Sequence, residues 1–331
     1  MSGRTRIVLS AASLLGAAAL LIALPYVVGV NWRQIGIEIG HLGTVEIFLL
    51  TLLWAAGLWA YTFVLTTSLP GLTHVHAFML NAVGSAVSNL LPFGGAAGVA
   101  VTFAMARGWG HRNAAITVST LVTGVWNVLS RLSLPAVGVA ALLIAGELPD
   151  RRTAVTASFA AAALLGVVVL LAFVLRSEAA ARAVEGWTPR AGRLLLALRH
   201  RTVGVVRAGW KGLTLGMVAY LLSQALLLEG CLVAVGADVG PAEVVAVFAV
   251  NRMLTTAVIT PGGAGISETS TAALLVHFAV PAAPAAAATI LYSFYTYAIE
   301  MPTGGAAWAA WTLRRRRKNI TSSTPNRTLV K

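Results

Sequence analysis

Charged residues are scarce in this chain. Of its 331 residues, 11% are charged and 58% are hydrophobic. A soluble domain of this length would need far more charge to cover its surface, so that class is excluded. Apolar stretches of about 20 residues, the length that crosses a bilayer, recur along the chain. The sequence therefore predicts an all-α, polytopic membrane protein with about 6–8 transmembrane helices plus broken or re-entrant helices.

Cysteine is almost absent as well. The single Cys231 lies in an apolar run, so the chain can form no intrachain disulfide and shows no thiolate metal site. The histidines have no metal-binding spacing, and no nucleophile–base pair stands out. We therefore expect a protein that is not an enzyme and that uses no metal or cofactor.

Acidic residues are outnumbered by basic ones, and the formal net charge is +13. In a soluble protein this charge would suggest nucleic acid, but the cytoplasmic loops of membrane proteins collect Lys and Arg. We expect no nucleic-acid partner; the expected partner is membrane lipid. One orientation puts nearly all Lys and Arg inside. It places a multi-pass protein in the bacterial cell (inner) membrane with both termini cytoplasmic.

The apolar pattern divides the chain into a single transmembrane domain, residues 1–312, and a disordered basic cytoplasmic tail, residues 313–331. A short mixed segment, residues 31–43, is expected at the membrane interface. A cytoplasmic basic loop, residues 176–212, follows the middle of the chain; an amphipathic helix lying on anionic lipid is the alternative for this segment. The expected spans and interrupted segments are 7–30, 44–69, 74–106, 113–146, 154–175, 213–236, 242–280 and 283–312.

Two repeat units, about 44–146 and 213–312, share one plan: a span, an interrupted segment and a long run that contains a proline. A shift of 169 positions brings Pro92 onto Pro261 and Arg131 onto Glu300. In the predicted topology the first interrupted segment enters from the cytoplasm and the second from outside. The sequence thus predicts an inverted repeat, an arrangement in which transporters hold their ligands where the broken helices meet. Chance matching of the two halves is the alternative.

Each interrupted segment contains a proline and glycines that break the helix. The first break has Pro92, Gly94 and Gly95; the second has Pro261, Gly262, Gly263 and Gly265. Freed backbone groups cost several kcal/mol each in lipid, so such breaks belong beside protein or a wet cavity. A helix that restarts there presents N–H groups that suit an anion, such as a lipid phosphate. A helix hairpin packed through small residues explains each motif equally well.

Ionisable residues at membrane depth are the other candidates for the site. They are Arg131, Arg252, Glu229, Glu268 and Glu300. A lone charge at the bilayer centre costs about 3 kcal/mol, so these groups should pair or face a polar cavity. The preferred pair is Arg131 with Glu300, and the second is Arg252 with Glu268 or Glu229. The structural alternatives are an ion pair without function and, for Glu268, a cap on the restarted helix.

Two motifs resemble a known family. "NLLPFGGAAGVAVTF" (residues 89–103) and "ITPGGAGISETSTAALL" (residues 259–275) resemble the lysylphosphatidylglycerol synthase transmembrane-domain family, which is flippase-like. The resemblance spans roughly residues 44–312. It implies roles for Pro261, Gly262, Gly263, Gly265 and Glu268, and the movement of a phospholipid or polyprenyl-linked lipid between leaflets.

The sequence departs from the pattern of this family in two respects. Many members have a carboxylate after the first break, whereas this chain has Ala96, Ala97 and Gly98. Full-length synthases add a soluble aminoacyl transferase domain. Since the largest soluble piece here is residues 176–212, we expect no synthase activity.

The leading hypothesis is a flippase-like protein that moves or binds an anionic phospholipid or polyprenyl-linked lipid. Under it, Glu268→Gln should abolish translocation and leave folding intact. The alternative is a non-transporting accessory protein that presents lipid to a membrane glycosyltransferase or other envelope enzyme. The alternative predicts a stable membrane enzyme partner and no flipping by the chain alone.

Overall fold

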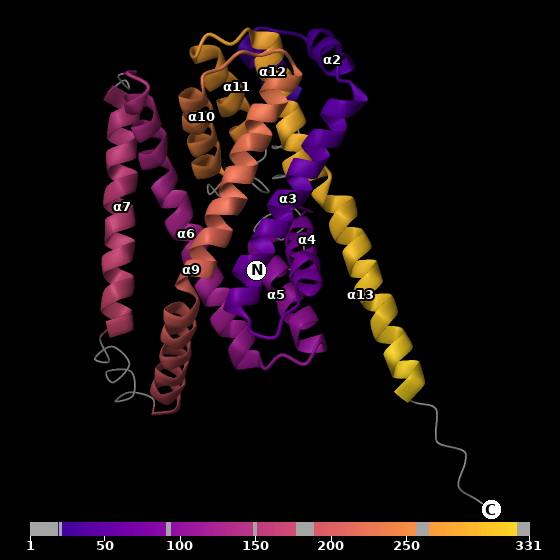
Figure 1. Ribbon diagram of the computed structural model, residues 1–331, viewed down its shortest axis with the longest axis vertical. Helices are drawn as coiled ribbons and strands as arrows, with labels where there is room; N and C mark the ends of the chain where they lie inside the picture. The colour runs from indigo at the N-terminus through magenta and orange to yellow at the C-terminus, as the bar shows by residue number, and fades with distance from the viewer. Residues whose placement is uncertain are drawn as a thin grey trace, which may run out of the picture.

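The computed structural model describes residue 19 and residues 22–90, 94–147, 151–176, 189–255 and 265–322. These residues form helices and short connections, with no strand among them (Figure 1). The elements named below are α2 (Trp32–Gly40), α3 (Thr44–Ser68), α4 (His74–Leu90), α5 (Gly94–Gly108), α6 (Asn113–Ile144), α7 (Arg151–Arg176), α9 (Pro189–Ala234), α10 (Pro241–Leu254), α11 (Ile266–His277), α12 (Ala282–Ser293), a π-helical turn η2 (Phe294–Ala298) and α13 (Glu300–Ser322).

The helices confirm the predicted all-α membrane fold. Within the described part of the chain, three helical stretches are long and apolar enough to cross a bilayer by length and composition: Thr44–Ser68, Asn113–Ile144 and Leu196–Ala234. Two hairpins, α4–α5 and α10–α11, are made of helices too short to span alone. Their connections, residues 91–93 and 256–264, lie outside the described residues.

Helix α9 differs from the expected loop at residues 176–212. From Pro189 onward this segment is helical and continuous with the following span. Leu198, Val205 and Val206 of this segment pack against a core cluster that includes Val118 and Val122 of α6. Because this apolar face continues that of the span, the helix extends through the basic sequence.

The last apolar run, residues 283–312, is not one regular α-helix. It is divided by η2, in which Ile299 N–H donates to the Phe294 carbonyl. Pro302 follows one turn later and has no N–H to donate to Ala298. A local π-helical turn at this point offsets Glu300 from a regular α-helical position.

The two halves pack in matching ways. Helix α3 packs along α9, α4 packs on α13 as α10 packs on α6, and the hairpins α4–α5 and α10–α11 correspond. In Figure 1, α10 and α11 lie in the upper half of the molecule, whereas α4 and α5 lie in the lower half. This packing matches the predicted inverted repeat.

Glycine brings the two halves into close contact. An added Cβ at Gly304 of α13 would overlap the Ala82 carbonyl and the Ala86 side chain of α4. The corresponding crossing of α6 on α10 has Gly138, where a Cβ would lie 3.2 Å from the Ala249 Cβ. Both crossings therefore depend on small residues, as helix contacts in membranes commonly do.

The connections group at the two ends of the molecule as the topology requires. The start of α9, the α5–α6 connection and the end of α13 lie at the lower end in Figure 1, and α2 and the end of α6 lie at the upper end. We call these the lower end and the upper end below. That the lower end faces the cytoplasm stays a prediction from the basic residues.

Candidate functional site

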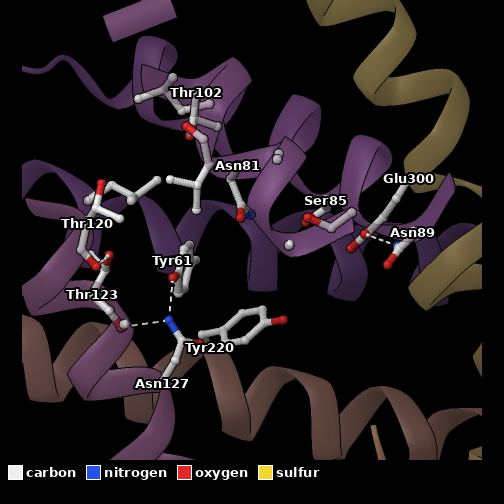
Figure 2. A pocket seen from close by; sticks show the side chains of 18 of the residues that line it. Tyr61, Asn81, Ser85, Asn89, Thr102, Thr120, Thr123, Asn127, Tyr220 and Glu300 are labelled. Carbon is white, nitrogen blue, oxygen red and sulfur yellow. Dashed lines mark hydrogen bonds between the residues drawn. The ribbon is translucent and has the colours of Figure 1, made fainter. Parts of the chain in front are cut away.

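A cavity of about 610 Å³ lies between the two halves. It is bordered by residues of α3, α4, α5, α6, α9 and α10, of η2 and of the start of α13 (Figure 2). Leu69, Ala106 and Ile116 line it near the lower end, and Arg131, near the middle of α6, lines its deep part. The cavity thus runs from the lower end to about the middle of the transmembrane helices.

The first break forms part of the cavity wall. Gly94 and Gly95 both line the cavity. A Cβ at Gly94 would overlap the Ser88 backbone, so glycine is required for the close approach of α5 to α4. A Cβ at Gly95 would meet nothing within 4 Å, since this residue faces open space. Pro92 lies outside the described residues.

Glu300 reaches the first hairpin from the other half of the molecule. It is 8% exposed and lines the cavity at the start of α13. Its carboxylate accepts a hydrogen bond from the Asn89 amide at 3.2 Å, and Ser85 lies on the same side of the cavity (Figure 2). The α4–α5 hairpin, which has no carboxylate in the described part of its own helices, therefore receives one from α13.

Arg252, at the end of α10, lines the same cavity. Its guanidinium donates to Gln224 Oε1 at 2.9 Å and to the Tyr292 hydroxyl at 3.1 Å. It also lies 5.4 Å from the centre of the Phe248 ring. These contacts hold the Arg252 cation at the cavity in a fixed orientation.

Arg131 is the least constrained charge of the site. Among the described residues, no hydrogen bond or ion pair holds its guanidinium, and its nearest electrostatic partners include the like-charged Arg252. The predicted pair of Arg131 with Glu300 does not form. Arg131 on α6 and Glu300 on α13 occupy equivalent positions of the repeat. The two helices pack on different partners, since α6 packs on α10 and α13 packs on α4. Both residues therefore line one cavity without direct contact.

Glu268 is placed as a helix cap. It is 1% exposed and accepts hydrogen bonds from Gly265 N–H at 2.6 Å, the Ser267 hydroxyl at 2.8 Å and the Ser293 hydroxyl at 3.0 Å. Gly265 has φ +87°, a conformation that favours glycine. These donors take the place of the predicted partner Arg252. Glu229, the other predicted partner of Arg252, is likewise not among its contacts described above.

The second break thus differs from the first in its surroundings. Glu268 and Gly265 are not among the described residues that line the cavity. Tyr297 of η2 lines the cavity and also interacts electrostatically with Glu268. Pro261, Gly262 and Gly263 lie outside the described residues, and their predicted role in binding stays a prediction.

The remaining lining mixes apolar and polar residues, and its polar members were only partly expected from the sequence. Asn81, Ser85, Asn89 and Asn127 are polar residues within apolar helices, a pattern that the sequence makes visible. Tyr61, Tyr220, Gln224 and Tyr297 also line the cavity, but aromatic residues of membrane helices are equally common in cores and interfaces. No cluster of three or more potential metal-binding His, Cys, Asp or Glu residues occurs in the described part of the chain.

Comparison with known families identifies the family of this chain. The model of the lysylphosphatidylglycerol synthase TM region matches residues 7–304. The chain therefore belongs to this family, which confirms the resemblance seen in the two glycine motifs. A search of curated proteins gives no significant match. The chain is a membrane protein of a family connected with lipid handling.

Proposed function

We propose that this protein moves an anionic phospholipid or polyprenyl-linked lipid across the bilayer, with the head group bound in the cavity. The observation that carries the proposal is the Arg131 guanidinium. It lines a cavity near mid-helix and has no hydrogen-bonding partner among the described residues. An unpaired cation at that depth costs about 3 kcal/mol, and an anionic ligand would offset this cost.

The charges of the described lining favour an anion. Arg131, Arg252 and Glu300 are its charged members, so two guanidinium groups face one carboxylate. Guanidinium groups bind phosphate oxygens through charge-assisted hydrogen bonds. Water that enters the cavity from the lower end would not remove the preference for an anion, because the inner wall of the cavity is protein. A lipid phosphate fits this arrangement better than a cationic or neutral group.

The inverted halves support movement rather than binding alone. In this conformation the cavity extends toward the lower end, and Glu268, at the start of α11, is buried outside it. If the α4–α5 and α10–α11 hairpins exchanged their conformations, the cavity would open toward the upper end. Transporters with inverted repeats commonly work by such an exchange around a central site.

A flipping assay in liposomes tests the proposal. Purified protein is reconstituted with a trace of a fluorescent anionic lipid, and a membrane-impermeant quencher reports its movement between leaflets. We expect Arg131→Gln to slow movement by roughly tenfold or more, through loss of a charge-assisted contact. Arg33→Gln, which removes the same charge from an exposed residue of α2, is the matched control and should behave as wild type.

The other outcomes discriminate between the hypotheses. Equal flipping by wild type and Arg131→Gln would refute the role of the cavity. Wild-type protein that retains lipid but does not flip it would favour the accessory function, in which the chain presents lipid to a membrane enzyme partner.

A further inference from the structure

One side of the cavity is bordered by α5 and α6, which pack on each other only near the lower end. There, Met105 and Ala106 of α5 join Ile116 of α6 in one buried cluster. Further toward the upper end, α5 packs chiefly along α4 and makes few contacts with α6. The cavity wall between α5 and α6 is therefore closed at its lower edge, and its upper part depends on the side chains of the two helices.

Gly124 marks the edge of the cavity on α6. It lines the cavity, and a Cβ added there would meet no atom within 4 Å. Leu121 and Val128 are its neighbours on the helix surface; they are 49% and 45% exposed and are not among the described lining residues. Exposed apolar side chains of a membrane helix face lipid. At Gly124 the cavity face of α6 thus passes directly into its lipid-facing surface.

Val99 marks the corresponding edge on α5. It lines the cavity and is 45% exposed, whereas Ala96, three residues before it, is exposed and is not among the described lining residues. Beside the two edges, the Thr102 hydroxyl donates to the Val99 carbonyl and the Thr120 hydroxyl donates to the Ile116 carbonyl (Figure 2). These hydroxyl protons are therefore used within their own helices, which suits an apolar neighbour.

The depth of the two edges corresponds to hydrocarbon. Val99 lies nine residues from the end of α5 at Gly108, and Gly124 lies eleven residues from the start of α6 at Asn113. Both edges are thus roughly 15 Å from the lower ends of their helices. Since the hydrocarbon core of a bilayer is about 30 Å thick, an opening between these edges faces acyl chains.

We infer that the apolar chain of the bound lipid leaves the cavity between Val99 and Gly124 while its phosphate stays at Arg131. This inference rests on the proposed function and adds a second subsite to it. Arg131 is seven residues beyond Gly124 on the same face of α6, so the two subsites are about 10 Å apart, close enough for one lipid molecule to occupy both. The lipid then enters sideways from the lower leaflet, and its chains remain in hydrocarbon.

Filling the opening tests the inference in the liposome flipping assay. Gly124→Leu puts a branched side chain between α5 and α6, and we expect it to slow lipid movement by roughly tenfold. Gly124→Ala adds one methyl group where space is open and should remain within about twofold of wild type. Gly166→Leu is the matched control, because Gly166 is an exposed glycine of α7 at which a Cβ meets no atom within 4 Å. It should behave as wild type.

A photoreactive lipid locates the chain without altering the opening. Phosphatidylglycerol with a diazirine in one acyl chain is bound to the purified wild-type protein in detergent, and the labelled peptides are mapped by mass spectrometry. We expect label on residues 95–102 of α5 and 120–128 of α6. Arg131→Gln should lose this label, because the phosphate no longer holds the lipid. Size-exclusion chromatography reports whether Gly124→Leu folds; if it does not, the photolabelling decides the question.

The contrary results separate the inference from the proposed function. Equal label on these residues in wild type and Arg131→Gln would show lipid on the outer surface only and would overturn the inference. Unchanged lipid movement by Gly124→Leu, or equal slowing by Gly166→Leu, would also overturn it. In each of these cases, slow movement by Arg131→Gln would leave the proposed function standing. Equal movement of lipid by wild type and Arg131→Gln would overturn both.

Discussion

The two helix hairpins of this protein are equivalent in the repeat but differ in their surroundings. The α4–α5 hairpin borders a cavity and receives Glu300 from the other half. In the α10–α11 hairpin, the Glu268 carboxylate at the start of α11 is buried outside that cavity and is held by Gly265, Ser267 and Ser293. The helices are arranged symmetrically, but the carboxylates near the two hairpins have different surroundings. One carboxylate thus lies at the cavity, and the other accepts hydrogen bonds at the start of α11.

The largest effect on stability is expected at Glu268. Glu268→Gln replaces a buried charge that accepts from three donors, so it should lower the free energy of unfolding by roughly 3 kcal/mol. Thermal unfolding in mild detergent measures this loss. The result would differ from the sequence-based expectation that this variant folds normally. A stability equal to that of wild type would contradict the capping role.

The glycines of the first break give the next largest effect. Gly94→Ala places a Cβ against the Ser88 backbone and should destabilise the protein by about 2 kcal/mol. Gly95→Ala introduces the same group into open space and is the matched control. Denaturation of the two variants, followed side by side, should separate them. Equal stabilities would show that α4 and α5 approach less closely than described.

The carboxylate at the cavity should behave differently from Glu268. Glu300→Gln removes the one carboxylate of the described lining, so the site becomes more positive. We expect tighter binding of an anionic lipid, by about fivefold, and a smaller change in stability than Glu268→Gln gives. Lipid titration by native mass spectrometry checks the direction. Weaker binding would mean that Glu300 contacts a donor group of the ligand.

The smallest effect concerns pH at the upper end. Glu147 follows α6, and its contact with the carboxyl group of Glu243, in the first turn of α10, raises the pKa of Glu147. The neutral form of Glu147 is thus favoured in the folded protein. The contact stabilises the fold at low pH, and this contribution is lost as pH rises through the raised pKa. Glu147→Gln should flatten the pH dependence of the unfolding temperature relative to wild type. Superimposable pH profiles would contradict this assignment.

Much of this architecture could be predicted from the sequence because hydropathy and helix breakers act locally. The boundaries of α3, α4–α5 and α6 follow from apolar length, Pro92 and the glycines. The repeat followed from the spacing of the prolines. The continuous helix α9 was not predicted, because its apolar face is mixed with basic residues and becomes clear only against α6.

The partners of the charges were harder to predict. Sequence equivalence suggested Arg131 with Glu300, but equivalent positions in an inverted repeat need not meet. The η2 turn and the crossing of α13 on α4 bring Glu300 to Asn89 instead. No local pattern shows which tyrosine or glutamine meets Arg252, because those contacts depend on tertiary packing. The charged residues of the site were visible in the sequence, whereas their pairing and the tyrosines and Gln224 of the lining were not.

The most direct test of the central claim is native mass spectrometry of the protein purified in mild detergent, with no lipid added. The claim is that the cavity binds an anionic lipid at Arg131. We predict that wild type and Arg33→Gln retain the same phosphate-bearing lipid and that Arg131→Gln loses it. Retention of the same lipid, in the same amount, by all three proteins would contradict the claim.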